Sequence, residues 1–397
     1  MTIGLCWTAT CATARAEDPP PLDGRDGRNL LLESFRPKSM LKVAEHPLAG
    51  AKFPVVDVHV HPRFRLRSSP EMLADFVKLM DAQNIAVCVS LDGGLGEQFA
   101  EHRKYLWTND RDRWVIFANV DWRGTGQEKD PGTWDCQRPD FARRTAAALA
   151  AAKEQGASGL KVFKGLGLEY RNPDGSLIRV DDPRWDPIWE ACGKLELPVL
   201  IHTADPRAFF LPIDATNERW EELRRHPDWS FHRPGFPTYE ELLAQFLRVV
   251  ERHPRTIFIG AHVASSAEDL GAVGKWLDKY PNLNIDIAAR IAELGRQPYT
   301  ARKFMLKYAD RILFATDGPR VAERLAYHWR FLETFDEYFP YAEPAFPPQG
   351  FWMIYGLGLP DDVLKKVYNA NAARLIPGVA ERLKAYEERQ PREPAAQ

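Results

Sequence analysis

The sequence predicts an α/β fold in which a single (β/α)8 TIM barrel carries long loop insertions at the carboxyl ends of its strands. Three observations lead to this fold class: eight short apolar runs suited to β-strands, helical patterns between them, and polar residues where several runs end. The runs are continuously apolar, as expected for parallel strands that are covered on both faces. We expect these strands at 55–61, 85–91, 114–120, 159–163, 198–202, 256–261, 283–287 and 311–315.

Helical signals fall between the predicted strands. Ser69 before Pro70 is typical of a helix start, and an apolar stripe at helical spacing follows it. Thr238 with Glu241 forms a capping-box pattern ahead of another apolar stripe. Further helices are expected at 140–155, 183–195, 266–280, 299–308 and 361–375.

Three connections are longer than ordinary loops and are interpreted as insertions: 169–182, 203–237 and 329–353. The aromatic residues of 203–237 either line a pocket or only pin this segment to the barrel, and both interpretations stay open. We assign 51–378 to the barrel, 1–50 to an N-terminal arm and 379–397 to a C-terminal tail.

The first sixteen residues allow two interpretations. Their moderately apolar run ends at Ala14-Arg15-Ala16, which resembles a signal-peptide cleavage site, but no Lys or Arg precedes the run and threonines interrupt it. A flexible arm on a cytoplasmic protein is favoured over a signal peptide at 1–16 that would direct the chain to the periplasm or outside the cell.

Composition restricts the kinds of partner. The formal charge of -2 is spread without long runs of one sign, so no nucleic-acid surface is expected. No stretch reaches the roughly 20 apolar residues that span a bilayer, so no membrane partner is expected. We expect a small-molecule substrate and leave a homo-oligomer open. The five cysteines include no CxxC pair and are expected to be free thiols: Cys6, Cys11, Cys88, Cys136 and Cys192.

Two histidines at the end of the first predicted strand form the core of a predicted metal site. His59 and His61 share one face of the strand with Asp57, because alternate side chains of a strand point the same way. Burying three polar groups on one strand face is costly unless something binds them. Taken alone, the pair could also be two histidines that are only hydrogen-bonded.

Other polar residues lie in the later predicted strands or just after their carboxyl ends. His202, His262 and Asp317 lie at or just after strand ends, and Lys161 lies within the fourth strand. In a parallel barrel these ends meet at one mouth, where catalytic residues are expected. The sequence therefore predicts that they gather around a divalent ion.

Several motifs resemble the amidohydrolase superfamily, in the branch that includes relatives of aminocarboxymuconate semialdehyde decarboxylase. They cover residues 54–378 and are VVDVHVHP from Val55, LPVLIHT from Leu197, GAHVAS from Gly260, DRILFATDGP from Asp310 and NANAARLIPG from Asn369. The resemblance implies a metal-dependent enzyme on a TIM barrel.

The resemblance also implies a ligand set. Its members are His59, His61, His202 and Asp317, while His262 matches a residue that is a second-metal ligand or a catalytic group. GLKVFKGLG from Gly159 resembles a segment whose lysine is carboxylated and bridges two metals, so Lys161 is either such a ligand or a residue that holds a salt bridge or substrate. One or two ions are therefore expected, with Zn²⁺ favoured and Mn²⁺ or Fe²⁺ as alternatives.

The expected reaction is hydrolysis of a small carboxylated or cyclic substrate, such as a lactone, amide or ester, by water that the metal activates. Asp317 is the expected proton shuttle, and His262 is expected either to polarise the carbonyl or to act as general acid/base. Asp57 either orients an imidazole or only makes a hydrogen bond at the strand start. The alternatives are a decarboxylase of the same branch and a barrel that binds ligand without turnover.

Substrate contacts are expected from residues that follow other strands. Arg290 is suited to bind a carboxylate in bidentate fashion. Asp92, Asp121, Trp122 and Arg171 lie on the same predicted face. Surface salt bridging is the alternative role for the charged members of this set.

Overall fold

The computed structural model of the chain describes residues 30–31, 34–35, 37–342 and 349–389. Its contacts divide the chain into two units, 1–42 and 43–397. In the first unit the backbone N–H of Leu41 donates to Ser39 Oγ at 3.1 Å. The second unit holds all the helices and strands named below. Residues 1–16, interpreted as a flexible arm or a signal peptide, lie outside the described residues, and so do Cys6 and Cys11.

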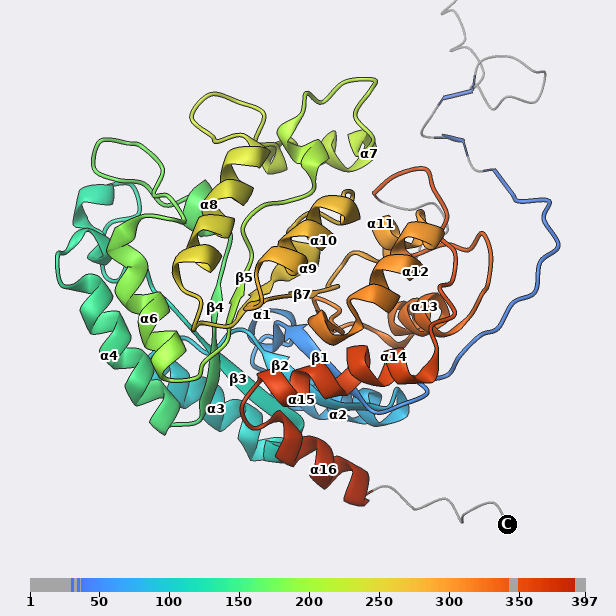
Figure 1. The fold of residues 1–397 in the computed structure, drawn as a ribbon, viewed down its shortest axis with the longest axis horizontal. Coiled ribbons are helices and arrows are strands. Elements are labelled where there is room, and N and C mark those ends of the chain that lie inside the picture. Colours follow the sequence, from blue (N-terminus) through green and yellow to red (C-terminus); the bar gives the residue numbers. More distant parts are fainter. Residues whose placement is uncertain (1–29, 32–33, 36, 343–348, 390–397) are drawn as a thin grey trace, which may run out of the picture. The chain divides into compact units, whose positions relative to one another are not determined.

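Eight parallel strands pair in sequence order and confirm the predicted barrel. Hydrogen bonds just beyond β8 join the two ends of the sheet: Val58 N–H donates to Phe314 O at 3.1 Å, and His61 N–H donates to Gly318 O at 2.7 Å. Figure 1 shows the strands surrounded by helices. The strands are β1 Val55–Val60, β2 Ile85–Ser90, β3 Trp114–Asn119, β4 Ala157–Val162, β5 Val199–Ile201, β6 Phe258–Gly260, β7 Leu283–Asp286 and β8 Ile312–Leu313.

The helices fill the connections between strands. They are α1 Pro62–Arg65, α2 Pro70–Ala82, α3 Glu97–Asp110, α4 Phe141–Glu154, α5 Gly165–Leu168, α6 Asp186–Lys194, α7 Trp220–Leu223, α8 Tyr239–Arg252, α9 Ala261–Ala264, α10 Leu270–Lys279, α11 Ile291–Gly295, α12 Pro298–Lys307, α13 Ala322–Glu333, α14 Asp361–Lys365, α15 Asn371–Leu375 and α16 Val379–Arg389. Both predicted helix starts are confirmed: Ser69 Oγ accepts from Met72 N–H at 3.2 Å, and Thr238 and Glu241 form the capping box. Among the described residues, no helix is long and apolar enough to span a bilayer.

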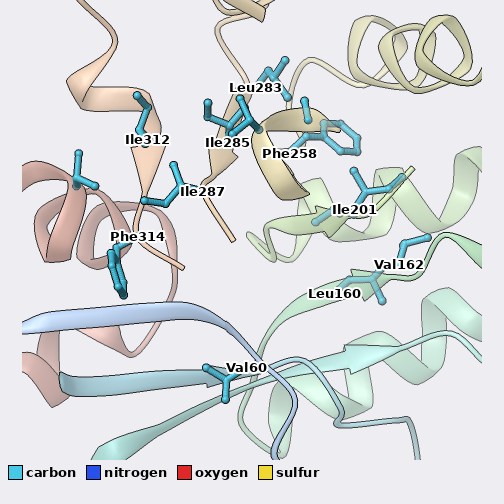
Figure 2. Close-up of a cluster of buried hydrophobic side chains, with 14 of the residues drawn as sticks. Val60, Leu160, Val162, Ile201, Phe258, Leu283, Ile285, Ile287, Ile312 and Phe314 are labelled. Carbon is cyan, nitrogen blue, oxygen red and sulfur yellow. The ribbon is translucent and has the colours of Figure 1, made fainter. Parts of the chain in front are cut away.

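Alternation along the strands separates the core from the site. Figure 2 shows one buried hydrophobic cluster, to which β4 contributes Leu160 and Val162, β7 contributes Leu283 and Ile285, and β1 contributes Val60. Successive strand side chains point to opposite faces. The residues between or beside these apolar positions, such as Lys161 and His59, therefore point away from this cluster.

Candidate metal centre

Three side chains at the carboxyl end of the barrel bring possible metal-binding atoms together. His59 lies in β1, His61 follows it, and Asp317 follows β8. Asp317 Oδ1 lies 3.8 Å from His59 Nε2 and 3.6 Å from His61 Nε2, which is too long for hydrogen bonds. Donors on one tetrahedral ion with bonds of about 2.1 Å would lie about 3.4 Å apart. The donor set and its spacing therefore fit a single divalent ion.

Carboxylates behind the two imidazoles fix which nitrogen faces the site. His59 Nδ1 lies 2.8 Å from Asp286 Oδ2, and His61 Nδ1 lies 2.6 Å from Asp92 Oδ1. Because an ionised carboxylate only accepts hydrogen bonds, each Nδ1 carries the proton and each Nε2 keeps its lone pair. Such outer partners orient ligand histidines and raise their basicity.

The sequence predicts Asp92 only as a substrate contact, indicates no role for Asp286, and suggests Asp57 for the orienting role. The carboxylate of Asp57 instead accepts from the backbone N–H of His59 at 3.2 Å and from Thr316 N–H and Oγ1 at 3.1 and 2.5 Å. This is the alternative in which Asp57 only makes hydrogen bonds within the barrel frame. The sequence feature that could have indicated Asp286 is a single carboxylate near the end of a predicted apolar strand.

His262 lies beside His59, with ring centroids 4.9 Å apart. Its Nδ1 donates to Ala288 O at 2.8 Å, so Nε2 is the nitrogen with a lone pair. His59, His262 and Asp286 also form a close group. Asp286 already accepts from His59 Nδ1 and, through Oδ1, from the backbone N–H groups of His262 at 2.7 Å and Ala288 at 3.0 Å. These hydrogen bonds explain why His59, His262 and Asp286 lie close together without a metal ion.

His202 lies beyond His262, with ring centroids 4.4 Å apart. Among the described residues it belongs to neither close group of donor atoms. Its Nε2 lies 3.1 Å from Ala204 O and 3.5 Å from Asp205 Oδ1. The structure thus brings three of the four expected ligands together, and His202 as a ligand stays a prediction.

Lys161 is buried beside the cluster. Its Nζ lies 3.4 Å from His59 Nε2, and among the described residues no carboxylate lies within ion-pair distance of it. Burial lowers the pKa of Lys161 to about 8, so a neutral amine is accessible near neutral pH.

Burial keeps three imidazoles of the site neutral at neutral pH, those of His59, His202 and His262. Burial, followed by the charge of Lys161, holds the pKa of His59 well below its usual value. Burial lowers the pKa of His202 to about 4, and burial with neighbouring His202 and Arg290 lowers the pKa of His262. Neutral imidazoles are the form that binds metals.

Two arginines that the sequence does not mark as site residues flank Asp317. Arg65 Nη2 lies 3.4 Å and Arg320 Nη2 lies 3.5 Å from Asp317 Oδ2. Asp317 itself has φ 57°, a left-handed backbone conformation that costs free energy in a non-glycine residue, as does His262 at 58°. Strained backbone of this kind concentrates at functional sites.

Of the other expected substrate contacts, Arg290 lies near the histidines of the site. It is buried, its Nη1 donates to Ala289 O at 2.8 Å, and its charge lowers the pKa of His262. Asp121 accepts from the backbone N–H groups that follow it, and Arg171 donates to Gly175 O within its own hairpin. Trp122 is buried and packs edge-on against Trp185 at 5.0 Å.

The 203–237 insertion is anchored on α8. Phe210 packs against Phe231 at 5.1 Å and Tyr239 at 5.6 Å, within a buried cluster that includes Leu242. These contacts pin the segment to the barrel, and Phe210, Phe231 and Phe236 also line a pocket with Tyr239, so the structure supports both interpretations of the aromatic residues.

Comparison with known proteins places the chain in a family. A comparison with curated sequences found no match. Among solved structures, 2,6-dihydroxybenzoate decarboxylase is 18% identical with a TM-score of 0.48, over 81% of this chain and 98% of that one. The Polaromonas sp. JS666 dihydroxybenzoic acid decarboxylase, solved with manganese, is 17% identical with a TM-score of 0.46, over 82% and 96%. The 4-oxalomesaconate hydratase of Rhodopseudomonas palustris is 13% identical with a TM-score of 0.48, over 84% and 99%.

None of these structural similarities assigns a reaction to the chain. The amidohydrolase family profile, in contrast, matches residues 56–378, which span the barrel and all the residues of the candidate metal centre. This match confirms the resemblance seen in the motifs, and the chain belongs to the amidohydrolase family.

Proposed function

We propose that the protein is a metal-dependent hydrolase that acts on a lactone, amide or ester bond in a small carboxylated or cyclic substrate. The observation that carries the proposal is the spacing of His59 Nε2, His61 Nε2 and Asp317 Oδ1, with the far nitrogen of each imidazole held by a carboxylate. A set of two imidazoles and one carboxylate with positions left open for water is typical of catalytic rather than structural sites.

We propose one ion per chain, with zinc as the best match to these donors. The second group of candidate donors supports a single ion, because Asp286 already accepts three hydrogen bonds. When bound, a divalent ion supplies Lewis acidity and brings the pKa of its water toward roughly 7.

His262 is proposed as the general base. Its Nδ1 is committed to Ala288 O, so its Nε2 can accept a proton but, while the ring is neutral, cannot donate one to a carbonyl. Of the two roles expected for His262, this geometry supports acid/base chemistry. Arg65 and Arg320 both lie beside Asp317 Oδ2, which leaves Oδ1 to face the two imidazoles and supports a ligand role for Asp317 over a proton shuttle.

Two buried cations complete the proposed site. The Lys161 ammonium is placed to stabilise negative charge that develops on the substrate near His59. Arg290 has no ion-pair partner among the described residues, which leaves its guanidinium available for a substrate carboxylate.

Product analysis tests the reaction. The zinc-loaded protein is incubated with carboxylated lactones, esters and amides, and with aromatic and enoic acids, and products are identified by mass spectrometry. The proposal expects water to be added across a lactone, ester or amide bond. Carbon dioxide release from an acid, with no hydrolysis in the panel, would instead assign a decarboxylase. His262→Gln should abolish turnover while the protein keeps its zinc.

A further inference from the structure

Two phenylalanines contact the imidazole of His61 at the carboxyl end of the barrel. The ring centroid of Phe64 lies 6.2 Å from that of His61, and the ring centroid of Phe163 lies 5.8 Å from it. Phe64 belongs to α1, directly after β1, and Phe163 follows β4. Among the described residues, neither phenylalanine is part of a buried hydrophobic cluster. Packing in the core therefore does not explain either side chain.

Phe64 is exposed although the backbone that carries it is fixed. The residue is 67% exposed. The backbone N–H of Arg65 donates to His61 O at 3.1 Å. The backbone N–H of Arg63 donates to Asp92 Oδ2 at 3.0 Å, and the other oxygen of Asp92 lies 2.6 Å from His61 Nδ1. The carboxylate that orients a candidate metal ligand therefore also holds the short helix that presents Phe64.

Phe163 lies on the face of β4 that points into the site. Side chains two positions apart along a strand share a face, so Phe163 points the same way as Lys161, while Val162 between them packs in the hydrophobic cluster of Figure 2. Lys161 Nζ lies over the ring of Phe163, 5.4 Å from its centroid. The ring of Phe163 thus contacts both the buried amine and the imidazole of His61.

We propose that Phe64 and Phe163 are specificity-determining residues, which form an apolar wall for a planar aromatic ring beside the reacting bond of the substrate. A substrate that reaches an ion at His61 lies next to both rings. Aromatic rings make stacked or edge-on contacts with one another that a saturated ring does not reproduce. The inference rests on the proposed metal-dependent hydrolysis and narrows its substrates to aromatic compounds, such as a lactone fused to an aromatic ring.

The affinities of two acids for the zinc-loaded full-length protein, measured by isothermal titration calorimetry, test this wall. Benzoate and cyclohexanecarboxylate have the same charge and the same number of carbon atoms, but only benzoate has a planar ring. The wild-type protein should bind benzoate more tightly. Phe64→Leu and Phe163→Leu keep an apolar side chain, and each should lower the affinity for benzoate about 2- to 10-fold more than that for cyclohexanecarboxylate, the range for one aromatic contact.

Phe335→Leu is the matched control for Phe64→Leu. Phe335 is 69% exposed and lies under the guanidinium of Arg302, 5.3 Å from its ring centroid. This control should bind both acids as the wild type does. Three results would overturn the proposal: no preference of the wild type for benzoate, an unchanged ratio of the two affinities in Phe64→Leu, or an equal change of that ratio in the control. Phe64→Leu carries the test if Phe163→Leu does not fold.

The zinc content of the variants distinguishes the wall from a structural role. If the two rings only supported His61, their removal would lower the zinc bound per chain and leave the ratio of the two affinities unchanged, which would overturn the proposal. The proposal expects both variants to keep wild-type zinc after loading and dialysis, together with the reduced preference for benzoate.

Hydrolysis of two lactones separates this inference from the proposed function. Dihydrocoumarin is δ-valerolactone fused to an aromatic ring, and Phe64→Leu should raise the KM for dihydrocoumarin more than that for δ-valerolactone. If the wild type hydrolyses no lactone, ester or amide but Phe64→Leu weakens benzoate binding, the proposed function fails and the aromatic wall stands. If the wild type hydrolyses lactones and Phe64→Leu changes neither the ratio of acid affinities nor the ratio of KM values, only the inference fails.

Discussion

Replacing Asp286 with asparagine should weaken metal binding although Asp286 is not expected to touch the ion. Its Oδ1 accepts from two backbone N–H groups, those of His262 and Ala288, and its Oδ2 accepts from His59 Nδ1. In Asp286→Asn the amide oxygen must face the two backbone donors, so the amide nitrogen faces His59. A donor at that place requires an unprotonated Nδ1, which moves the proton to Nε2 and removes the lone pair that would bind the ion.

The size of the effect follows from this change of tautomer. Loss of an outer partner of a ligand histidine lowers metal affinity by about 10- to 100-fold, which corresponds to about 1.4 to 2.8 kcal/mol. We expect the upper end, because Asp286 is fully buried and two backbone donors fix the orientation of the amide.

A zinc titration against a competing chelator measures the affinity, and circular dichroism checks that the variant is folded. Asp278→Asn is the matched control, since Asp278 is exposed and accepts from Lys307 and Tyr308 on the barrel surface. Its zinc affinity should equal that of the wild type. A folded Asp286→Asn protein with wild-type affinity would refute the tautomer argument.

Three further substitutions test the electrostatics and the frame of the barrel. Burial lowers the pKa of Lys161 to about 8, so the charge of Lys161 opposes an ion beside His59 below that pH and is lost above it. The zinc affinity should therefore rise as the pH increases through about 8, and Lys161→Met should flatten this rise. Weaker zinc binding by this variant at every pH would indicate a lysine ligand instead. Arg219→Leu should lower the free energy of unfolding by about 3–5 kcal/mol, because fully buried Glu293 loses its ion-pair partner. Urea unfolding should show little change in this free energy for the control Arg207→Leu, which breaks an exposed ion pair. Equal losses of free energy in the two variants would contradict the argument. Thr238→Ala should reduce stability by about 1 kcal/mol through loss of the α8 capping box, so an unchanged urea midpoint would be inconsistent with that cap.

The strands and the histidines were predictable because both depend on local sequence. Apolar runs of strand length mark all eight strands, and the alternation of side chains places His59 and His61 on one face. Helix α3 was missed because its sequence has no continuous apolar stripe, and α16 because the segment after 378 was interpreted as a tail.

The partners of the histidines were less predictable because they depend on how the barrel closes. Arg65 and Asp317 are 252 positions apart in sequence and meet only where the segment after β8 joins β1. Asp286 contacts His59 across the barrel, 227 positions away. Sequence spacing carries no information about such pairs, and the position of the His202 ring depends on one carbonyl and one carboxylate in its own loop.

The zinc content of the purified wild-type chain tests the central claim most directly. The account predicts one tightly bound divalent ion per chain after zinc loading and dialysis, and loss of that ion in Asp317→Asn. A folded wild-type protein that retains no divalent ion, or an Asp317→Asn protein that retains as much zinc as the wild type, would contradict it.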